Sequence, residues 1–128
     1  MYDNICMSCL FDSLSYFINE ASIDIRNKIC DYLEQNKPII EGADTNKIIE
    51  YENNSVHDYI NNMRSTSAPG GAIEIQAACN IWNISINVHN YRDPSNKIIQ
   101  FIPMNKIYDS IINIYWTGGH YEPIKTKR

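Results

Sequence analysis

One stretch decides the fold: Pro69-Gly70-Gly71-Ala72-Ile73-Glu74-Ile75-Gln76-Ala77-Ala78-Cys79-Asn80-Ile81-Trp82-Asn83-Ile84-Ser85-Ile86-Asn87-Val88. Its proline and glycines are typical of a turn. Ile73, Ala77 and Ile81 then recur at helical spacing, which predicts a helix that begins just after the glycines. From residue 84 onward, apolar and polar side chains alternate, which predicts a half-buried strand. The stretch is therefore expected to form a helix that leads directly into a strand.

Outward from this stretch, helical patterns lie toward the N-terminus and strand patterns toward the C-terminus. Apolar spacing predicts helices over about residues 9–19, after Ser22, from Thr45 and after Ser55, with Ser22 and Ser55 as N-caps. Alternation predicts a strand over residues 84–88, and further strands are expected over 98–102, 111–116 and 120–124. This order is typical of the α+β class, with helices packed on a small, mostly antiparallel sheet. Its length, with no linker or repeat, predicts one domain over residues 1–128.

Composition and charge exclude several classes of protein. A formal net charge of -4 and the lack of a basic stripe disfavour nucleic-acid binding, because phosphate contacts need clustered Lys and Arg. The apolar runs are too short for a membrane span, and the first residues lack the features of a secretory signal. Free thiols in a reducing, cytoplasmic compartment are therefore expected. Abundant Ile and Asn, with more Lys than Arg, indicate an AT-rich coding genome, such as that of a large virus or an intracellular pathogen, which would place the protein in a host cell.

Cys9 lies at the start of the first predicted helix, where a thiol is well placed to react. The helix dipole and the free backbone N–H groups at a helix N-terminus lower the pKa of a thiol. The turn just before it, residues 5–8, would line an oxyanion hole with its backbone N–H groups. The residues expected to form this oxyanion loop are Cys6, Met7 and Ser8. A small, buried, apolar role for Cys9 is the alternative, because cysteine is among the most buried residue types.

His120 follows the turn Thr117-Gly118-Gly119 and precedes a second candidate group, Glu122. In a strand, residues i and i+2 point to the same face, so the carboxylate is expected to reach the imidazole. A thiol, an imidazole and an acid form the set that nucleophilic acyl transfer requires. A structural role for His120 is the alternative. His57 and His89 are expected at the surface.

Cys6-Met7-Ser8-Cys9 also has the C-x-x-C spacing of some metal and redox sites. A structural zinc site would need a second pair of ligands, but Cys30 and Cys79 are isolated on predicted helices. We therefore expect no metal, although a small metal or redox domain built on Cys6 and Cys9 stays as an alternative.

Three segments, taken in order, resemble one family, the ovarian tumour (OTU) cysteine proteases. Cys9-Leu10-Phe11-Asp12-Ser13-Leu14 is similar to the family's nucleophile segment. Residues 59–64, 69–78 and 84–88 resemble its Gly-Gly-x-x-Glu block and the strand after it, and residues 112–122 resemble its last strands. The resemblance implies a papain-like OTU fold. It further implies that Cys9 is the nucleophile, His120 the general base and Glu122 the orienting acid, with a substrate channel bordered by Pro69, Gly70, Gly71, Trp116 and Tyr121.

The same resemblance implies a deubiquitinase without a cofactor. Its partner would be ubiquitin, a polyubiquitin chain or a ubiquitin-like protein, and we expect it to act as a monomer. Two positions depart from the family: Cys6 replaces the usual Asp three residues before the nucleophile, and Pro69 replaces a Trp. Asp3-Asn4-Ile5-Cys6 offers another register, in which Cys6 would be the nucleophile. An inactive OTU-like module that only binds ubiquitin is a further alternative, motivated by the missing Asp.

Overall fold

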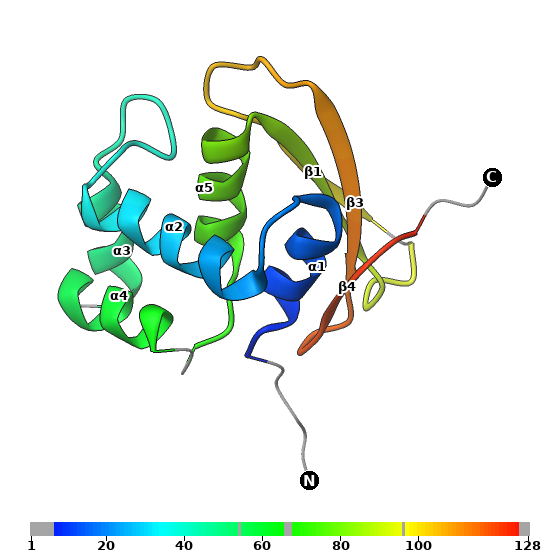
Figure 1. Cartoon of the computed structure of the whole chain (residues 1–128), viewed down its shortest axis with the longest axis horizontal. Coiled ribbons are helices and arrows are strands. Elements are labelled where there is room, and N and C mark those ends of the chain that lie inside the picture. The colour runs from blue at the N-terminus through cyan, green and yellow to red at the C-terminus, as the bar shows by residue number, and fades with distance from the viewer. Residues whose placement is uncertain (1–6, 54, 66–67, 96, 126–128) are drawn as a thin grey trace, which may run out of the picture.

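The computed structural model describes residues 7–53, 55–65, 68–95 and 97–125 (Figure 1). Helices occupy the first two thirds of this part of the chain, and strands follow, as the sequence patterns predicted. The elements are α1 (Cys9–Phe17), α2 (Ser22–Glu34), α3 (Thr45–Asn53), α4 (Val56–Arg64), α5 (Ala72–Trp82), β1 (Ile84–Asn90), β2 (Ile98–Phe101), β3 (Ser110–Trp116) and β4 (Tyr121–Pro123). The α+β class is therefore confirmed.

The strands form a mixed sheet in the order β2-β1-β3-β4. The two outer pairings, β1 with β2 and β3 with β4, are antiparallel, as expected. The central pairing of β1 with β3 is parallel and runs from Ile84 opposite Ser110 to Asn90 opposite Trp116. β2 lies on one side of β1, so the chain has to cross to the other side of β1 before β3 begins. The alternation within each strand did not predict this crossover, because it carries no information on strand order.

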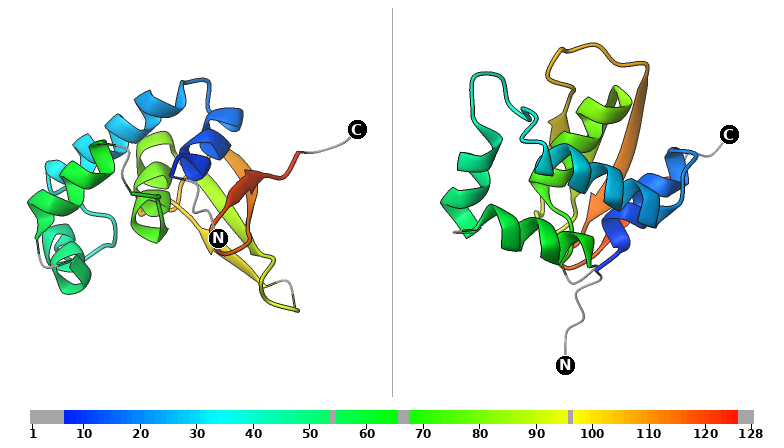
Figure 2. Two further views of the ribbon diagram at one scale, coloured as in Figure 1. Left: turned by 90° about the horizontal axis from the view of Figure 1, so that it is seen from below. Right: turned by 60° about the vertical axis from the view of Figure 1, so that its left-hand side comes forward.

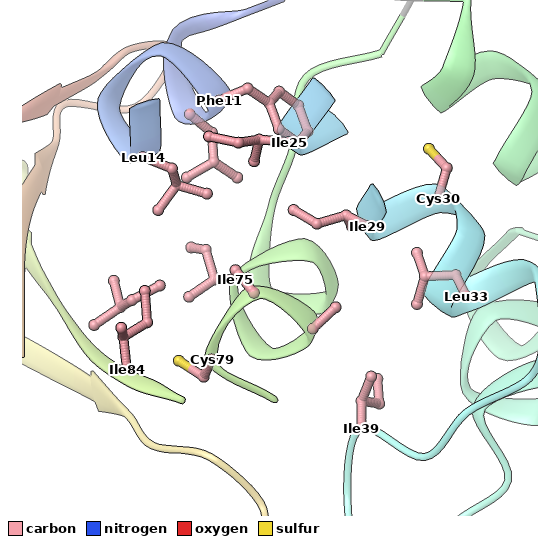
Figure 3. Packing of buried hydrophobic residues seen from close by; sticks show 14 of the residues in the cluster. Phe11, Leu14, Ile25, Ile29, Cys30, Leu33, Ile39, Ile75, Cys79 and Ile84 are labelled. Carbon is pink, nitrogen blue, oxygen red and sulfur yellow. The ribbon is translucent and has the colours of Figure 1, made fainter. Parts of the chain in front are cut away.

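The helices cover one face of the sheet, and the core lies between them (Figure 2). Ile84, Ile86 and Val88 alternate toward this interior along β1, and Ile112 and Ile114 do so along β3. Figure 3 shows side chains from α1, α2, α5 and β1 directed into the same interior. The helix after the glycines, α5, packs against α2 on one side and against β1 and β2 on the other, so it connects the helices to the sheet.

Two predicted helix caps have different outcomes. Ser55 caps α4 as predicted, because its hydroxyl accepts a hydrogen bond from the Asp58 N–H at 3.2 Å. The prediction for Ser22 is wrong: Ala21 is the N-cap of α2, and the Ser22 hydroxyl donates to Asp12 Oδ1 at 2.5 Å. A carboxylate on the neighbouring helix α1 competes successfully for this hydroxyl.

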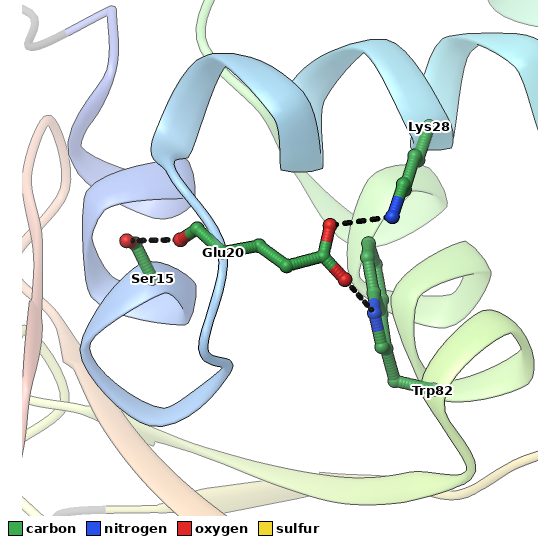
Figure 4. A network of polar contacts seen from close by, with 4 residues as sticks. All are labelled: Ser15, Glu20, Lys28 and Trp82. Carbon is green, nitrogen blue, oxygen red and sulfur yellow. Dashed lines mark hydrogen bonds and ion pairs between the residues drawn. The ribbon is translucent and has the colours of Figure 1, made fainter.

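Glu20 anchors the turn between α1 and α2 (Figure 4). Its carbonyl accepts from the Ser15 hydroxyl at 2.6 Å, and its carboxylate accepts from Lys28 Nζ at 2.7 Å and from Trp82 Nε1 at 3.0 Å. These hydrogen bonds lower the pKa of the Glu20 carboxyl, with the one from Lys28 contributing most. The C-terminal end of α1 is thereby tied to the end of α5. None of the helices within the described ranges combines the length and apolar character needed to cross a bilayer.

Candidate active site

Cys9 and His120 are 111 residues apart in the chain and meet in the fold, with 3.1 Å between Cys9 Sγ and His120 Nδ1. Cys9 is the first residue of α1, and His120 lies in the turn immediately before β4. Helix α1 packs against β4, which brings the thiol position to the imidazole (Figure 1). The sequence could propose these two residues, but only the packing of α1 on the last strand joins them.

The other nitrogen of the imidazole contacts Glu122, with 2.7 Å between His120 Nε2 and Glu122 Oε2. The His120 hydrogen bond, followed by one from Tyr115, lowers the pKa of the Glu122 carboxyl, so this group is an ionised acceptor at neutral pH. An ionised carboxylate can only accept, and Nε2 must therefore carry the proton. In the neutral imidazole this leaves Nδ1, on the Cys9 side, as the proton acceptor.

Cys9 is only 5% exposed, as the alternative of a buried apolar residue predicts. Its sulfur also lies beside a half-exposed imidazole, and this contact is what the alternative did not predict. Cys9 is disulfide-bonded in this structure, so its sulfur can attack a substrate only after reduction. Reductant is therefore part of every assay proposed below.

Cys30 and Cys79 have entirely different surroundings. Both are free and buried, and burial raises the pKa of Cys30 to about 11 and that of Cys79 to about 12. Thiols of this kind are almost fully protonated at neutral pH and react slowly. Among the described cysteines, Cys9 alone has an imidazole within hydrogen-bonding distance.

Met7 and Ser8 lead into α1, and Ser8 is the N-cap of that helix without a side-chain hydrogen bond to it. The Met7 carbonyl accepts a hydrogen bond of 2.6 Å from Arg26 Nη2. Cys6, the third residue of the predicted oxyanion loop and the alternative nucleophile, lies outside the described residues, as does its pairing in the C-x-x-C motif.

Gly70 and Gly71 occupy different environments in the predicted substrate channel. Gly70 is buried, and a Cβ added there would come within 3.0 Å of Phe11 Cζ and even closer to Leu10 Cδ2. The close approach of the backbone to α1 therefore requires glycine at this position. Gly71 is half-buried, with Glu74 Oε1 at 3.9 Å from such a Cβ, so this position has room for a methyl group. Pro69, just before them, is exposed.

Trp116 and Tyr121 are opposite each other in the β3–β4 pairing, on the two sides of the turn that contains His120. Both are half-buried and pack against the core. Burial raises the pKa of the Tyr121 hydroxyl. The structure therefore places these two channel candidates on either side of the turn that contains His120, and it places Gly70 against the helix that carries Cys9.

Glu74, from the Gly-Gly-x-x-Glu block, is a buried structural carboxyl. It accepts hydrogen bonds from the Gly71 N–H at 2.7 Å and from the Tyr59 hydroxyl. Burial raises the pKa of this carboxyl, which these hydrogen bonds partly offset. Glu74 thus holds the start of α5 and the loop before it in one arrangement.

Arg26 and Tyr115 contact the site, although the sequence did not single out either one. Tyr115 pairs with Glu122 across the β3–β4 ladder, hydrogen-bonds to its carboxylate and stacks on Tyr91 with ring centroids 4.6 Å apart. A period-2 count from Glu122 across a hairpin would have found it. Arg26 lies on α2 four residues before Cys30, next to the apolar stripe of that helix. Residues four apart share a helix face, so this spacing was the available signal that the Arg26 side chain is buried.

The other two histidines have partners elsewhere. His57 is exposed, with its Nε2 2.9 Å from Asn61 Nδ2, and His89 Nε2 lies 3.0 Å from Asn113 Oδ1 on the outward phase of β1. His120 is the histidine that the described part of the chain brings to a cysteine.

Comparison with known proteins gives matches over nearly the whole chain. Residues 8–121 match the model of the OTU-like cysteine protease family. Ubiquitin thioesterase otu2 of Schizosaccharomyces pombe is 27% identical over 132 residues, which cover 91% of this chain but 42% of that protein. The chain thus spans less than half the length of this relative.

Solved structures show the same fold. An OTU domain in complex with ubiquitin superposes with a TM-score of 0.73 at 23% identity, covering 96% of this chain and 66% of that one. The viral OTU domain protease from Dera Ghazi Khan virus has a TM-score of 0.69 at 20% identity, covering 96% of this chain and 77% of that one. With the family model matched from just before Cys9 to just after His120, this chain belongs to the OTU-like cysteine protease family.

Proposed function

We propose that this protein is a thiol-dependent deubiquitinase that hydrolyses the (iso)peptide bond after the C-terminal glycine of ubiquitin or a ubiquitin-like protein. One observation supports the proposal most directly: the Cys9 sulfur lies 3.1 Å from His120 Nδ1, while His120 Nε2 is held 2.7 Å from Glu122. This is the order of nucleophile, base and acid that acyl transfer by a thiol requires.

The acylation step begins with transfer of the Cys9 thiol proton to His120 Nδ1. The thiolate attacks the carbonyl carbon of the C-terminal glycine, and the carbonyl oxygen becomes an oxyanion, which backbone N–H groups ahead of α1 bind. The tetrahedral intermediate then collapses as the C–N bond breaks. His120 gives its Nδ1 proton to the leaving lysine amine, which leaves a thioester on Cys9.

Deacylation repeats the same proton transfers with water in place of the amine. His120 Nδ1 accepts a proton from water as the hydroxide oxygen attacks the thioester carbonyl. The C–S bond breaks, His120 returns its proton to the Cys9 sulfur, and the ubiquitin carboxyl group leaves and gives its own proton to solvent. Glu122 stabilises the imidazolium in both steps and stays ionised.

Ubiquitin is the proposed substrate because an OTU domain similar in fold has been solved with ubiquitin bound, and because the curated relative is a ubiquitin thioesterase. Pro69, Gly70, Gly71, Trp116 and Tyr121 would border the channel for its extended tail. We place the enzyme in a reducing compartment such as the cytoplasm, since Cys9 acts only as a thiol, and we propose that it acts as a monomer.

A ubiquitin probe with a C-terminal electrophile tests this proposal in the presence of reductant. Wild-type protein and Cys6→Ala are expected to form the covalent adduct, whereas Cys9→Ala is not, and His120→Ala is expected to form it far more slowly. Labelling that persists in Cys9→Ala and disappears in Cys6→Ala would assign the nucleophile to Cys6. Measurable ubiquitin affinity of the wild type without labelling or chain cleavage would instead indicate an inactive binding module.

A further inference from the structure

Arg26 is a buried cation whose hydrogen bonds converge on carbonyls next to the site. It is 1% exposed. Nη2 donates to the Met7 carbonyl at 2.6 Å, and Nη1 donates to the Met63 carbonyl at 2.7 Å and the Ala68 carbonyl at 3.1 Å. Its guanidinium carbon lies 4.2 Å from the centre of the Phe11 ring. One planar group thus joins the segment before α1, the end of α4 and the loop before α5.

A guanidinium in this position is costly for the fold. Burial removes its hydration and lowers the pKa of Arg26, and neutral carbonyls compensate a charge less well than a carboxylate does. An apolar side chain of similar volume would fill the same space without that penalty. Because the donors are directed at segments that border the site, positioning of those segments is the property that Arg26 supplies and an apolar residue would lack.

The hydrogen bond to Met7 determines where the next amide points. In a planar trans peptide, the carbonyl of residue i and the N–H of residue i+1 point in opposite directions, and the described residues contain no cis peptide bond. Because Arg26 holds the Met7 carbonyl, the Ser8 N–H must point away from the guanidinium. Ser8 directly precedes Cys9, so its N–H belongs to the group of donors from which an oxyanion hole is built.

The hydrogen bond to Ala68 fixes a second segment relative to the first. Nη1 and Nη2 belong to one rigid planar group, so the Ala68 and Met7 carbonyls are held at a set spacing. Ala68 precedes Pro69 and Gly70, which border the proposed channel. Lysine could not replace this arrangement, because its ammonium is a single point and cannot serve both segments in the same geometry.

We propose that Arg26 is a positioning residue, which orients the oxyanion-binding amides before Cys9 and locks them to the loop that leads to Gly70. This inference rests on the proposed hydrolase function. It assigns to a side chain on α2 a constraint on the backbone at Met7 and Ser8.

Two reactions of Cys9 separate positioning from general folding. Hydrolysis of a fluorogenic ubiquitin C-terminal amide passes through an oxyanion. Alkylation by iodoacetamide does not: the thiolate forms a C–S bond as the C–I bond breaks, and iodide leaves. Both rates are measured in three proteins that share the change Cys6→Ser: one with Arg26 intact, one with Arg26→Lys and one with Arg26→Gln. The change at Cys6 makes Cys9 the residue that is alkylated. All three are measured with the same reductant present.

Loss of an oxyanion donor lowers kcat by about 10²–10³-fold, so a fall of roughly 100-fold is expected in both variants. KM and the alkylation rate are expected to stay within about twofold, and circular dichroism is expected to show a native fold. Arg64→Gln is the matched control, because Arg64 forms exposed ion pairs with Asp31 and Glu34 and should leave both reactions unchanged. Equal losses in hydrolysis and alkylation, or no loss in hydrolysis, would overturn the proposal.

Amide hydrogen exchange gives a readout that does not depend on activity. In Arg26→Lys, the amides of residues 8–10 and of Ala68, Gly70 and Gly71 are expected to exchange faster, while those of β1 and β3 keep their protection. Unchanged exchange in both loops would refute the role of Arg26 even if the wild type proved inactive. Absence of hydrolysis in the wild type, with faster loop exchange in the variant, would refute the proposed function alone.

Discussion

Replacing Gly70 by alanine is expected to destabilise the fold, whereas the same change at Gly71 is not. At Gly70 the new Cβ would lie within 3.0 Å of Phe11 Cζ and closer still to Leu10 Cδ2. The Leu10 side chain is 1% exposed and that of Phe11 is 0% exposed, so neither can turn toward solvent. Overpacking of this kind costs about 1–3 kcal/mol. Alanine also lowers the entropy of the unfolded chain, which stabilises the fold by about 0.4–1 kcal/mol. The net loss in the free energy of unfolding is therefore roughly 1–2 kcal/mol.

Gly71 provides the matched control one residue away. Its backbone φ of -148° is accessible to alanine, and the nearest neighbour of an added Cβ, Glu74 Oε1, is 3.9 Å away. The same entropy gain applies here, and it opposes the lower preference for alanine at an N-cap, which costs about 0.5 kcal/mol or more. The two effects nearly cancel, and the stability of Gly71→Ala is expected to stay within about 0.5 kcal/mol of the wild type.

Urea denaturation followed by far-UV circular dichroism, in reductant, measures both variants. For an m-value of about 1–3 kcal/mol/M, Gly70→Ala should unfold at a midpoint lower by roughly 1 M, and Gly71→Ala at the wild-type midpoint. Adding Leu10→Ala should relieve the clash, so the double variant should lose less than the sum of the single losses. Equal stability of the two glycine variants, or full additivity with Leu10→Ala, would refute the packing argument.

Three further predictions concern titratable groups. Tyr115→Phe is expected to lower kcat severalfold with little change in KM, because Glu122 loses one of its two hydrogen-bond donors. The same change should have no effect on kcat in a Glu122→Gln background, and full additivity of the two changes would contradict this explanation. Burial raises the pKa of the Glu74 carboxyl, so the folded state binds this proton more tightly than the unfolded state does. The stability of the wild type relative to Glu74→Gln should therefore fall as the pH rises above 4.5, the ordinary pKa of a glutamate. Urea titrations at several pH values measure this slope, and the opposite slope would show that the fold stabilises the carboxylate. Cys30 and Cys79, with pKa values of about 11 and 12, should resist a thiol reagent at pH 8 until urea unfolds the protein, and rapid reaction of either in the native state would show that it is accessible.

Local patterns predicted most of the elements because they report a property of the chain itself. Apolar spacing located the helices, including the start of α5 after Gly71, alternation located β1, and the other three strands were also predicted close to their observed positions. The pattern did not predict the competition for Ser22 by Asp12, because the acceptor comes from another helix. It also did not predict that substitution of Gly70 is limited by packing against α1, because Leu10 and Phe11 come from a distant segment.

The candidate site divides in the same way. The proximity of His120 and Glu122 follows from two residues of one short segment, and the position of Cys9 at a helix start follows from the residues after it. The contacts of Arg26 with the Met7 and Ala68 carbonyls could not be predicted, because backbone carbonyls are present at every residue and carry no sequence signal. Which of them a buried donor reaches is decided by packing.

The sequence alone thus determined the order of the elements, the residue types of the site and the family resemblance, since these depend on spacing along a few neighbouring residues. The tertiary structure decided the parallel pairing of β1 with β3, the contact between Cys9 and His120, and the central position of Arg26. Each of these joins segments distant in the chain. Such contacts depend on how all the apolar faces pack together, and no local period records that packing.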